Sequence, residues 1–274
     1  MKNKKWIKRS VIFLFIVIVI SAWYERPVTE HISISSEGKI SKPVKFALIT
    51  DLHSGYYGEN QADLIYRIDK ENVDAILLSG DIFDDRLSMD NAEIFCKQIA
   101  EAYHCYYVTG NHELWSGKEA EIKEKLRAYG VVVLEGNSET ISLNGNNIDI
   151  GGVDDPTIMP AEEWERQIRE AENETNPENF KILLSHRPER VDTYKQHSFD
   201  LVVCGHAHGG QWKIPFTQTG FVAPNQGLFP RYVDGLYELD NGTKMVVSRG
   251  LARERMPYPR FFNHPEVVVI TIDY

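Results

Sequence analysis

Five short clusters rich in histidine, aspartate and glycine stand out in this 274-residue sequence. They are Asp51-Leu-His53, Gly80-Asp81-Ile-Phe-Asp84, Gly110-Asn111-His112-Glu113, Ser185-His186 and Gly205-His206-Ala-His208. Carboxylate, amide and imidazole groups together form a mixed oxygen and nitrogen ligand set. Such a set suits zinc, manganese or iron better than calcium, which prefers oxygen ligands alone. The clusters therefore predict a transition-metal centre.

Each cluster directly follows an apolar run that reads as a buried strand. These runs cover residues 44–50, 74–79, 104–109, 180–185 and 200–204. Asp51, Asp81 and Asn111 lie thirty residues apart, which is the length of one strand–helix–strand unit. Because the carboxyl ends of neighbouring parallel strands meet in one crevice, we expect the clusters to converge there.

The stretches between these runs read as amphipathic helices, near 58–71, 89–102, 117–129, 161–173 and 188–196. A second group of strands is predicted at 131–134, 139–152, 231–239, 243–248 and 266–272, with Asn144-Gly145 as a hairpin turn. This alternation predicts an α/β fold with mixed sheets covered by helices. Residues 26–43 are predicted to form a short stalk before a single domain at 44–274.

The order of the clusters resembles that of the calcineurin-like metallophosphoesterase family, whose five motifs appear here as DLH, GDIFD, GNHE, SH and GHAH. The resemblance extends from Lys45 to Tyr274. GHAHGGQ and the later VSRGL and FFNHPEVVVITI segments are most similar to a membrane-associated bacterial subgroup. The fold that this resemblance implies is a four-layer α/β/β/α sandwich of two mixed sheets flanked by helices.

The resemblance also implies a role for each motif residue, around two divalent ions of manganese, zinc or iron. The implied ligands are Asp51, His53 and His208 for the first ion, Asn111, His186 and His206 for the second, and Asp81 as the bridge. A bridging hydroxide would be the nucleophile, His112 the general acid, and Asp84 the residue that orients His112. Glu113 replaces the aspartate of many relatives.

Simpler interpretations exist for each residue taken alone. A single histidine is more often a hydrogen-bonded structural residue than a ligand, and a single aspartate is often a helix cap. Their recurrence after five strands favours the metal site. Arg187, near a motif, is interpreted as a surface ion-pair partner, with phosphate binding as the alternative. Trp115 fits either a substrate pocket or the core.

The formal charge of −10 is unevenly distributed along the chain. Five of the thirty basic residues fall within the first nine positions. The remainder has 25 basic and 40 acidic residues, which is a formal charge of −15. Because so acidic a body repels a polyanion, nucleic acid is not expected as a partner. The three cysteines form no metal-binding or disulfide pattern, and we expect them in the core.

The N-terminus reads as a membrane-targeting segment. The basic residues precede an apolar run, Val11–Ile20, that is shorter than the ~20 residues needed to span a bilayer comfortably. Bulky Trp23 and Tyr24 follow a poor cleavage site, so residues 1–25 are predicted to be an uncleaved anchor rather than a removed signal peptide. The charge bias then places the catalytic domain outside the cytoplasm. The alternative is a secreted protein.

Anchor and motifs together predict an envelope hydrolase that acts on a small or lipid-linked phosphodiester or pyrophosphate. A protein phosphatase or nuclease with the same metal core is the first alternative. A non-catalytic binding scaffold is the second, and it would predict lost ligands, whereas every motif residue is present.

Overall fold

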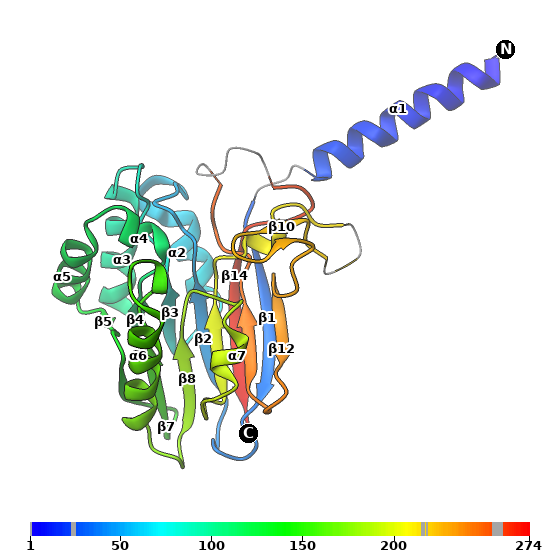
Figure 1. The fold of residues 1–274 in the computed structure, drawn as a ribbon. Coiled ribbons are helices and arrows are strands. Elements are labelled where there is room, and N and C mark those ends of the chain that lie inside the picture. Colours follow the sequence, from blue (N-terminus) through cyan, green and yellow to red (C-terminus); the bar gives the residue numbers. More distant parts are fainter. Residues whose placement is uncertain (1, 23–25, 215–216, 218, 254–259) are drawn as a thin grey trace.

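Two six-stranded mixed sheets form the centre of the fold (Figure 1). The computed structural model describes residues 2–22, 26–214, 217, 219–253 and 260–274. The first sheet has the order β1 (Val28–Ser35), β14 (Glu266–Asp273), β2 (Val44–Ile49), β3 (Ala75–Ser79), β4 (His104–Val108) and β5 (Val132–Val133). The second has the order β12 (Gly235–Glu238), β13 (Lys244–Val247), β9 (Leu201–Cys204), β8 (Phe180–Leu184), β7 (Asn146–Gly152) and β6 (Asn137–Leu143).

Helices cover the outer face of each sheet. The first sheet is covered by α2 (Ala62–Asp69), α3 (Asp90–Ala102) and α5 (Glu119–Tyr129). The second is covered by α6 (Ala161–Asn173) and the short α7 (Val191–Tyr194). Three apolar layers separate these elements: one under each set of helices and one between the sheets. The expected four-layer α/β/β/α sandwich is therefore confirmed.

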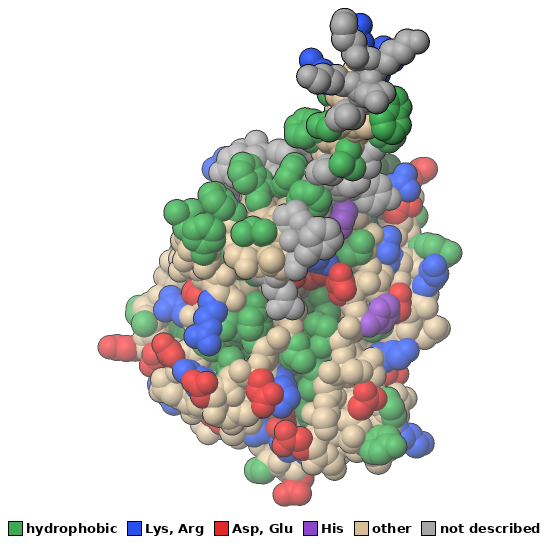
Figure 2. Space-filling view, turned by 90° about the vertical axis from the view of Figure 1, so that its right-hand side faces the viewer, with side chains coloured by type: hydrophobic (Ala, Val, Ile, Leu, Met, Phe, Trp, Pro, Cys, Tyr) green, Lys and Arg blue, Asp and Glu red, His purple; other side chains and the backbone are tan. Residues whose placement is uncertain are grey.

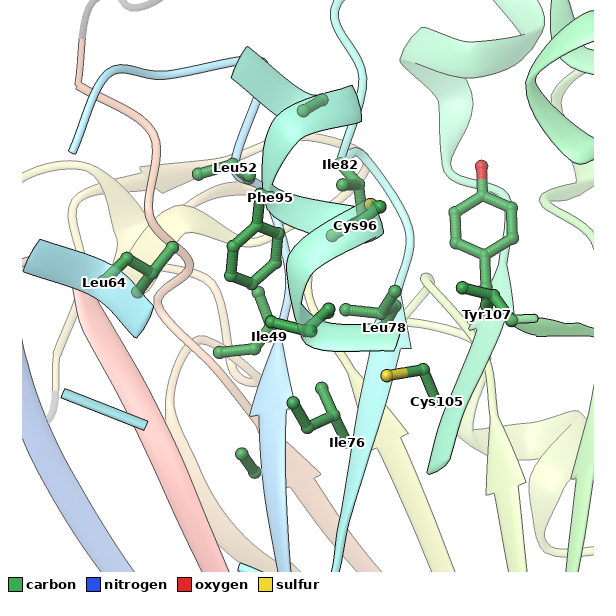
Figure 3. Packing of buried hydrophobic residues seen from close by; sticks show 14 of the residues in the cluster. Ile49, Leu52, Leu64, Ile76, Leu78, Ile82, Phe95, Cys96, Cys105 and Tyr107 are labelled. Atoms are coloured by element: carbon green, nitrogen blue, oxygen red, sulfur yellow. The ribbon is translucent and has the colours of Figure 1, made fainter. Parts of the chain in front are cut away.

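The side chains of strand β2 pack into two of these apolar layers. Successive side chains of a strand point to opposite faces. Ala47 and Ile49 accordingly pack under the helices, whereas Phe46 and Leu48 pack against the second sheet. Figure 3 shows the helix-side layer, where Phe95 of α3 lies over the strands. All three cysteines are free and buried, as expected.

The strands and helices predicted from apolar periodicity all appear, within a few residues at their ends. Asn144 and Gly145 join β6 to β7 with φ angles of 52° and 85°, the left-handed conformations that a tight hairpin turn needs.

The prediction of a stalk at residues 26–43 is wrong. Val28–Ser35 form β1, which pairs in parallel with all eight residues of β14. Its hydrogen bonds come from the far end of the chain, so no local pattern revealed it.

The N-terminal segment forms helix α1 (Lys2–Ala22), which projects from the domain in Figure 1. Trp23 and Tyr24 lie outside the described residues. Among the residues that are described, no helix combines the length and the apolar character needed to cross a bilayer.

Candidate metal centre and active site

The five predicted clusters lie together where strands of both sheets end. Loops after β2, β3 and β4 bring residues from the first sheet, and loops after β8 and β9 bring residues from the second. Several candidate ligands have left-handed backbones, with φ between 47° and 66° at Asp51, His53, Asp81, His206 and His208. Non-glycine residues rarely adopt this conformation, and such strain concentrates at functional sites.

Asp51, His53 and His208 form the first group of ligand atoms. Asp51 Oδ1 lies 4.0 Å from His53 Nε2 and 3.8 Å from His208 Nε2. Asp51 Oδ2 is held from behind, because it accepts hydrogen bonds from the Thr50 hydroxyl at 2.9 Å and from the backbone N–H of His206 at 3.1 Å. Three donor atoms therefore surround a space suited to one cation.

Asp81 lies between this group and the second, which contains Asp81, His186 and His206. Its Oδ1 accepts the backbone N–H of His112 at 2.8 Å. Its Oδ2 lies 3.2 Å from His186 Nε2 and 3.7 Å from His53 Nε2. One carboxylate oxygen is thus placed between a histidine of each group, as a bridging ligand requires.

Hydrogen-bond partners outside the metal centre orient the histidines of the second group. His186 Nδ1 lies 2.9 Å from the backbone oxygen of Ser79, which leaves Nε2 free to bind. His206 Nε2 lies 2.8 Å from Asn225 Oδ1 and also 2.8 Å from the NH1 group of Arg187, which can only donate. In the tautomer that donates from Nε2 to Asn225, Nδ1 is free and faces His186 Nε2 at 3.2 Å. Such outer contacts set the tautomer of a metal-binding histidine. Sequence reasoning missed Asn225, which belongs to no motif.

The buried polar atoms at the centre fit a pair of cations. His53 Nε2, Asp81 Oδ2 and Asn111 Oδ1 have no hydrogen-bond partner among the described residues, although such burial is costly. Burial, with the charges of His186 and Arg187, lowers the pKa of His206 to about 3, so its imidazole stays neutral and able to ligate. The residues present therefore fit two divalent ions: Asp51, His53 and His208 would hold one, and Asn111, His186 and His206 the other, with Asp81 between the two groups.

His112 lies at the edge of this centre, on α4 (Asn111–Trp115), with Nε2 4.0 Å from Asp81 Oδ2. Its Nδ1 lies 2.6 Å from Oδ1 of Asp85. The sequence prediction named only Asp84 for this contact, and Asp85 is the nearer carboxylate in the structure. Asp84 Oδ2 lies 3.6 Å from that nitrogen and instead contacts His53 Nδ1 at 3.2 Å. Both aspartates follow the same strand, and only the fold shows which one reaches which histidine.

Glu113 fastens two of the motif loops together. Its carboxylate accepts backbone N–H groups from Asp81 at 3.0 Å, Phe83 at 2.9 Å and Gly110 at 2.8 Å. The loops approach so closely that a Cβ on Gly110 would lie 2.2 Å from Asp81 Oδ1. No residue with a side chain fits at position 110, and Glu113 holds Asp81 against the start of α4.

A pocket of about 530 Å³ opens onto the centre. Its wall includes His112, Trp115, Arg187, Arg190 and Pro224. Arg187 is not the surface residue that was expected, because it is 5% exposed and its NH2 group donates to Asp155 Oδ1 at 2.9 Å. The rings of Trp115 and His112 lie 4.8 Å apart. Trp115 thus belongs to the pocket and not to the core.

Comparison with known proteins agrees with this geometry. Residues 44–210 match the sequence model described as calcineurin-like phosphoesterase. The chain is 30% identical to the uncharacterized metallophosphoesterase Cj0846 of Campylobacter jejuni, over 85% of this chain and 60% of that protein. It is 29% identical to the uncharacterized metallophosphoesterase YkuE of Bacillus subtilis (83% and 78%) and 28% identical to phosphodiesterase YaeI of Escherichia coli (71% and 70%).

The chain spans only about three fifths of the length of the Campylobacter relative and of similar Helicobacter pylori proteins. Among solved structures, NAD nucleotidase NadN of Haemophilus influenzae superposes with a TM-score of 0.51 at 17% identity, covering 78% of this chain and 46% of that one. Likeness at that identity shows the fold alone. The family match shows that the chain belongs to the calcineurin-like phosphoesterase family, and its two His/Asp groups could each hold a metal ion.

Proposed function

We propose that this enzyme hydrolyses a phosphodiester, small or lipid-linked, that carries an apolar or aromatic group on its leaving side. The observation that carries this proposal is the position of Trp115. Its ring lies 4.8 Å from that of His112, and both line the pocket. Because His112 is the candidate donor to the departing oxygen, the group attached to that oxygen lies against the indole.

The other residues of the pocket are proposed to bind the substrate and to transfer the proton. Two divalent ions in the ligand groups would activate a water molecule and neutralise phosphate charge. His112, held at Nδ1 by Asp85, presents Nε2 toward the centre and donates a proton to the leaving oxygen, a step worth roughly 10²–10⁴-fold in rate. Arg187, which is fixed by Asp155, and Arg190 add positive charge at the wall for an anionic substrate.

Two further points support a diester. One relative, from Escherichia coli, is named a phosphodiesterase. A diester also needs room on both sides of the phosphorus, and the pocket offers Trp115 and the separate Pro224–Asn225 turn as walls. A pyrophosphate bond in a lipid-linked substrate meets the same requirement. The acidic body opposes a nucleic-acid substrate.

The test uses the full chain loaded with manganese, assayed on a chromogenic diester and the matching monoester. We expect metal-dependent turnover with a clear preference for the diester, and its loss in His112→Ala and Asp81→Asn. Trp115→Leu should raise KM for an aryl diester more than for a methyl diester, with Trp115→Phe as the matched control. Preference for the monoester would reject the diester proposal while leaving the metallophosphoesterase assignment intact.

We also propose that α1 attaches the enzyme to a membrane. The segment carries cations Lys5, Lys8 and Arg9 and highly exposed apolar side chains, with Phe13 69% and Phe15 65% exposed. Exposure of such an apolar surface to water is unfavourable, and a surface of this kind marks a site that binds a membrane or a protein. Membrane fractions of expressing cells should retain the full chain after an alkaline wash. Replacing the apolar residues of 11–20 with serine should release it, and unchanged retention would reject this role. Location outside the cytoplasm remains a prediction that protease accessibility in intact cells would test.

A further inference from the structure

An exposed apolar surface lies beside the active site and is not used by the chemistry described above. The two-stranded ribbon of β10 (Val222–Ala223) and β11 (Gly227–Leu228) and the chain on either side of it carry this surface, which we call the hairpin patch. Its members are Trp212 (44% exposed), Ile214 (47%), Phe221 (40%), Val222 (38%), Leu228 (65%) and Phe229 (61%). Large apolar side chains gathered in this way on a surface mark an interaction site.

The patch is ordered by its own contacts. The rings of Trp212 and Phe221 stack with centroids 5.8 Å apart, and Phe221 meets Phe229 edge to face at the same distance. Backbone hydrogen bonds tie the same residues together, from Phe221 N to Trp212 O at 2.8 Å and from Phe229 N to Phe221 O at 2.9 Å. The patch is therefore one preformed surface and not a set of separate exposed residues.

The patch is also joined firmly to the metal centre. Gly220 and Gly210 approach so closely that a Cβ on either residue would lie within 2.6 Å of the other's Cα. Gly210 follows His208 by two residues, and its backbone oxygen accepts the N–H of Phe221 at 3.0 Å. At the other end of the ribbon, the Pro224–Asn225 turn lines the active-site pocket. Whatever the patch contacts lies next to the mouth of that pocket.

We propose that the hairpin patch docks onto a lipid bilayer and holds the pocket at the level of the lipid headgroups. Charge supports this partner over a second copy of the chain. Residues 201–233 contain no aspartate or glutamate, in a protein with a formal charge of −10. Arg231 is exposed, whereas the side chain of Lys213 is largely buried and its ammonium group is paired with Asp234 at 2.5 Å. Aromatic side chains with a nearby cation suit the interface of an anionic membrane, whereas two copies of so acidic a chain repel each other.

The position of α1 supports the same partner. Residue 28, which begins the domain after α1, donates its N–H to the backbone oxygen of Pro265 at 2.9 Å. The same C-terminal segment reaches the patch, since Lys213 N donates to Phe261 O at 2.9 Å and Trp212 bridges to Phe261. Figure 1 labels β10 at the end of the domain from which α1 leaves, and Figure 2 shows hydrophobic side chains gathered at that end. Attachment through α1 thus brings the patch toward the same surface.

The experiment places a reporter on the patch of the full chain. Leu228→Cys would carry an environment-sensitive fluorophore, and Leu236→Cys, on β12 and 44% exposed, would be the matched control. The native cysteines are buried, and labelled wild-type protein supplies the blank. On adding phosphatidylcholine vesicles that contain phosphatidylglycerol, the label at 228 should shift to the blue. Lipids that carry a quencher on the acyl chain should then quench it. The label at 236 should do neither.

A second variant tests the energetics. The double variant Phe221→Ser, Phe229→Ser should weaken vesicle binding of the full chain roughly tenfold or more. Two aromatic rings would then no longer be transferred from water into the bilayer on binding. Its circular dichroism spectrum and metal stoichiometry show whether it has folded. A label at 228 that remains in water while the protein sediments with vesicles would overturn the proposal, because α1 alone would then bind. A blue shift without vesicles, with a doubled solution mass, would also overturn it in favour of self-association. Neither readout uses hydrolysis, so failure here is distinct from failure of the proposed activity.

Discussion

Oδ1 of Asp85 lies 2.6 Å from Nδ1 of His112, a full ångström closer than the nearest oxygen of Asp84. Asp84 instead contacts His53, a candidate metal ligand, at 3.2 Å. Two adjacent aspartates therefore support two different functions of the centre. One positions the candidate proton donor, and the other positions a ligand.

This division predicts different defects for two similar variants. Asp85→Asn should lower kcat by roughly 10–100-fold for esters with poor leaving groups and much less for nitrophenolate, which departs without a proton. Its metal affinity should match that of wild type in calorimetry. Asp84→Asn should instead weaken the binding of one metal ion, because His53 loses its partner. The assignment would be wrong if Asp84→Asn showed the leaving-group dependence and Asp85→Asn did not.

Asn225 is predicted to be required for metal binding although no motif contains it. Its Oδ1 lies 2.8 Å from His206 Nε2 and accepts a hydrogen bond from Arg187 NH1 at 2.7 Å, so it favours the His206 tautomer whose Nδ1 is free to ligate. Asn225→Ala should lower the affinity for one of the two ions by about 10–100-fold, as is usual for lost outer partners of ligating histidines. Competition with a fluorescent chelator measures this. Asn241→Ala, in an exposed turn, is the control, and equal affinities in the two variants would exclude this function for Asn225.

The contact between Gly210 and Gly220 is predicted to be essential for the loop that carries His208. In Gly220→Ala the new methyl group would lie 2.6 Å from Gly210 Cα, so one of the two segments must move. We expect a loss of about 1–3 kcal/mol in unfolding free energy, as for other overpacked sites, together with weaker metal binding. Denaturant unfolding and metal titration measure the two effects. Gly227→Asn, on the same ribbon with nothing within 4 Å of the new atom, should be mild in both. Equal losses in the two variants would rule out the contact as the cause.

Lys123 links stability to pH away from the metal centre. Its ammonium group is buried, 2.9 Å from Asp154 and 2.8 Å from Glu135. Burial opposes the charge of Glu135, but Lys123 and then Arg127 lower its pKa. A carboxylate with a lowered pKa stabilises the fold above its unfolded pKa of about 4.5, and this contribution is lost as pH falls through the folded value.

Lys123→Met should therefore destabilise the metal-free protein at neutral pH by about 3–5 kcal/mol, because Asp154 keeps a buried charge without its partner. The difference from wild type should shrink below about pH 4.5. Thermal unfolding in chelator across this range measures both. Lys125→Met removes partly exposed pairs with Glu93 and Glu121 and should change stability less. A difference that stays constant with pH would exclude the proposed linkage.

Much of the fold and the metal centre followed from local sequence. The runs at 44–50, 74–79 and 104–109 are apolar because their strands are buried on both faces, and each polar cluster follows directly after such a run. Strand ends and turns depend on neighbouring residues, so Asp51, Asp81 and His206 were recognisable without coordinates. Ligand chemistry depends on residue type, which the sequence states outright.

Tertiary structure decided what depends on residues far apart in the chain. Strand β1 exists through its pairing with β14, so its segment looked like a stalk until the two ends of the chain were placed together. The choice between Asp84 and Asp85 depends on where His112 and His53 lie around one loop, and Asn225 reaches His206 only through the β10–β11 ribbon. Sequence therefore determined which groups perform the chemistry, because that is set by residue type and local spacing. The fold determined which neighbour orients each group, because that is set by distances between segments remote in the chain.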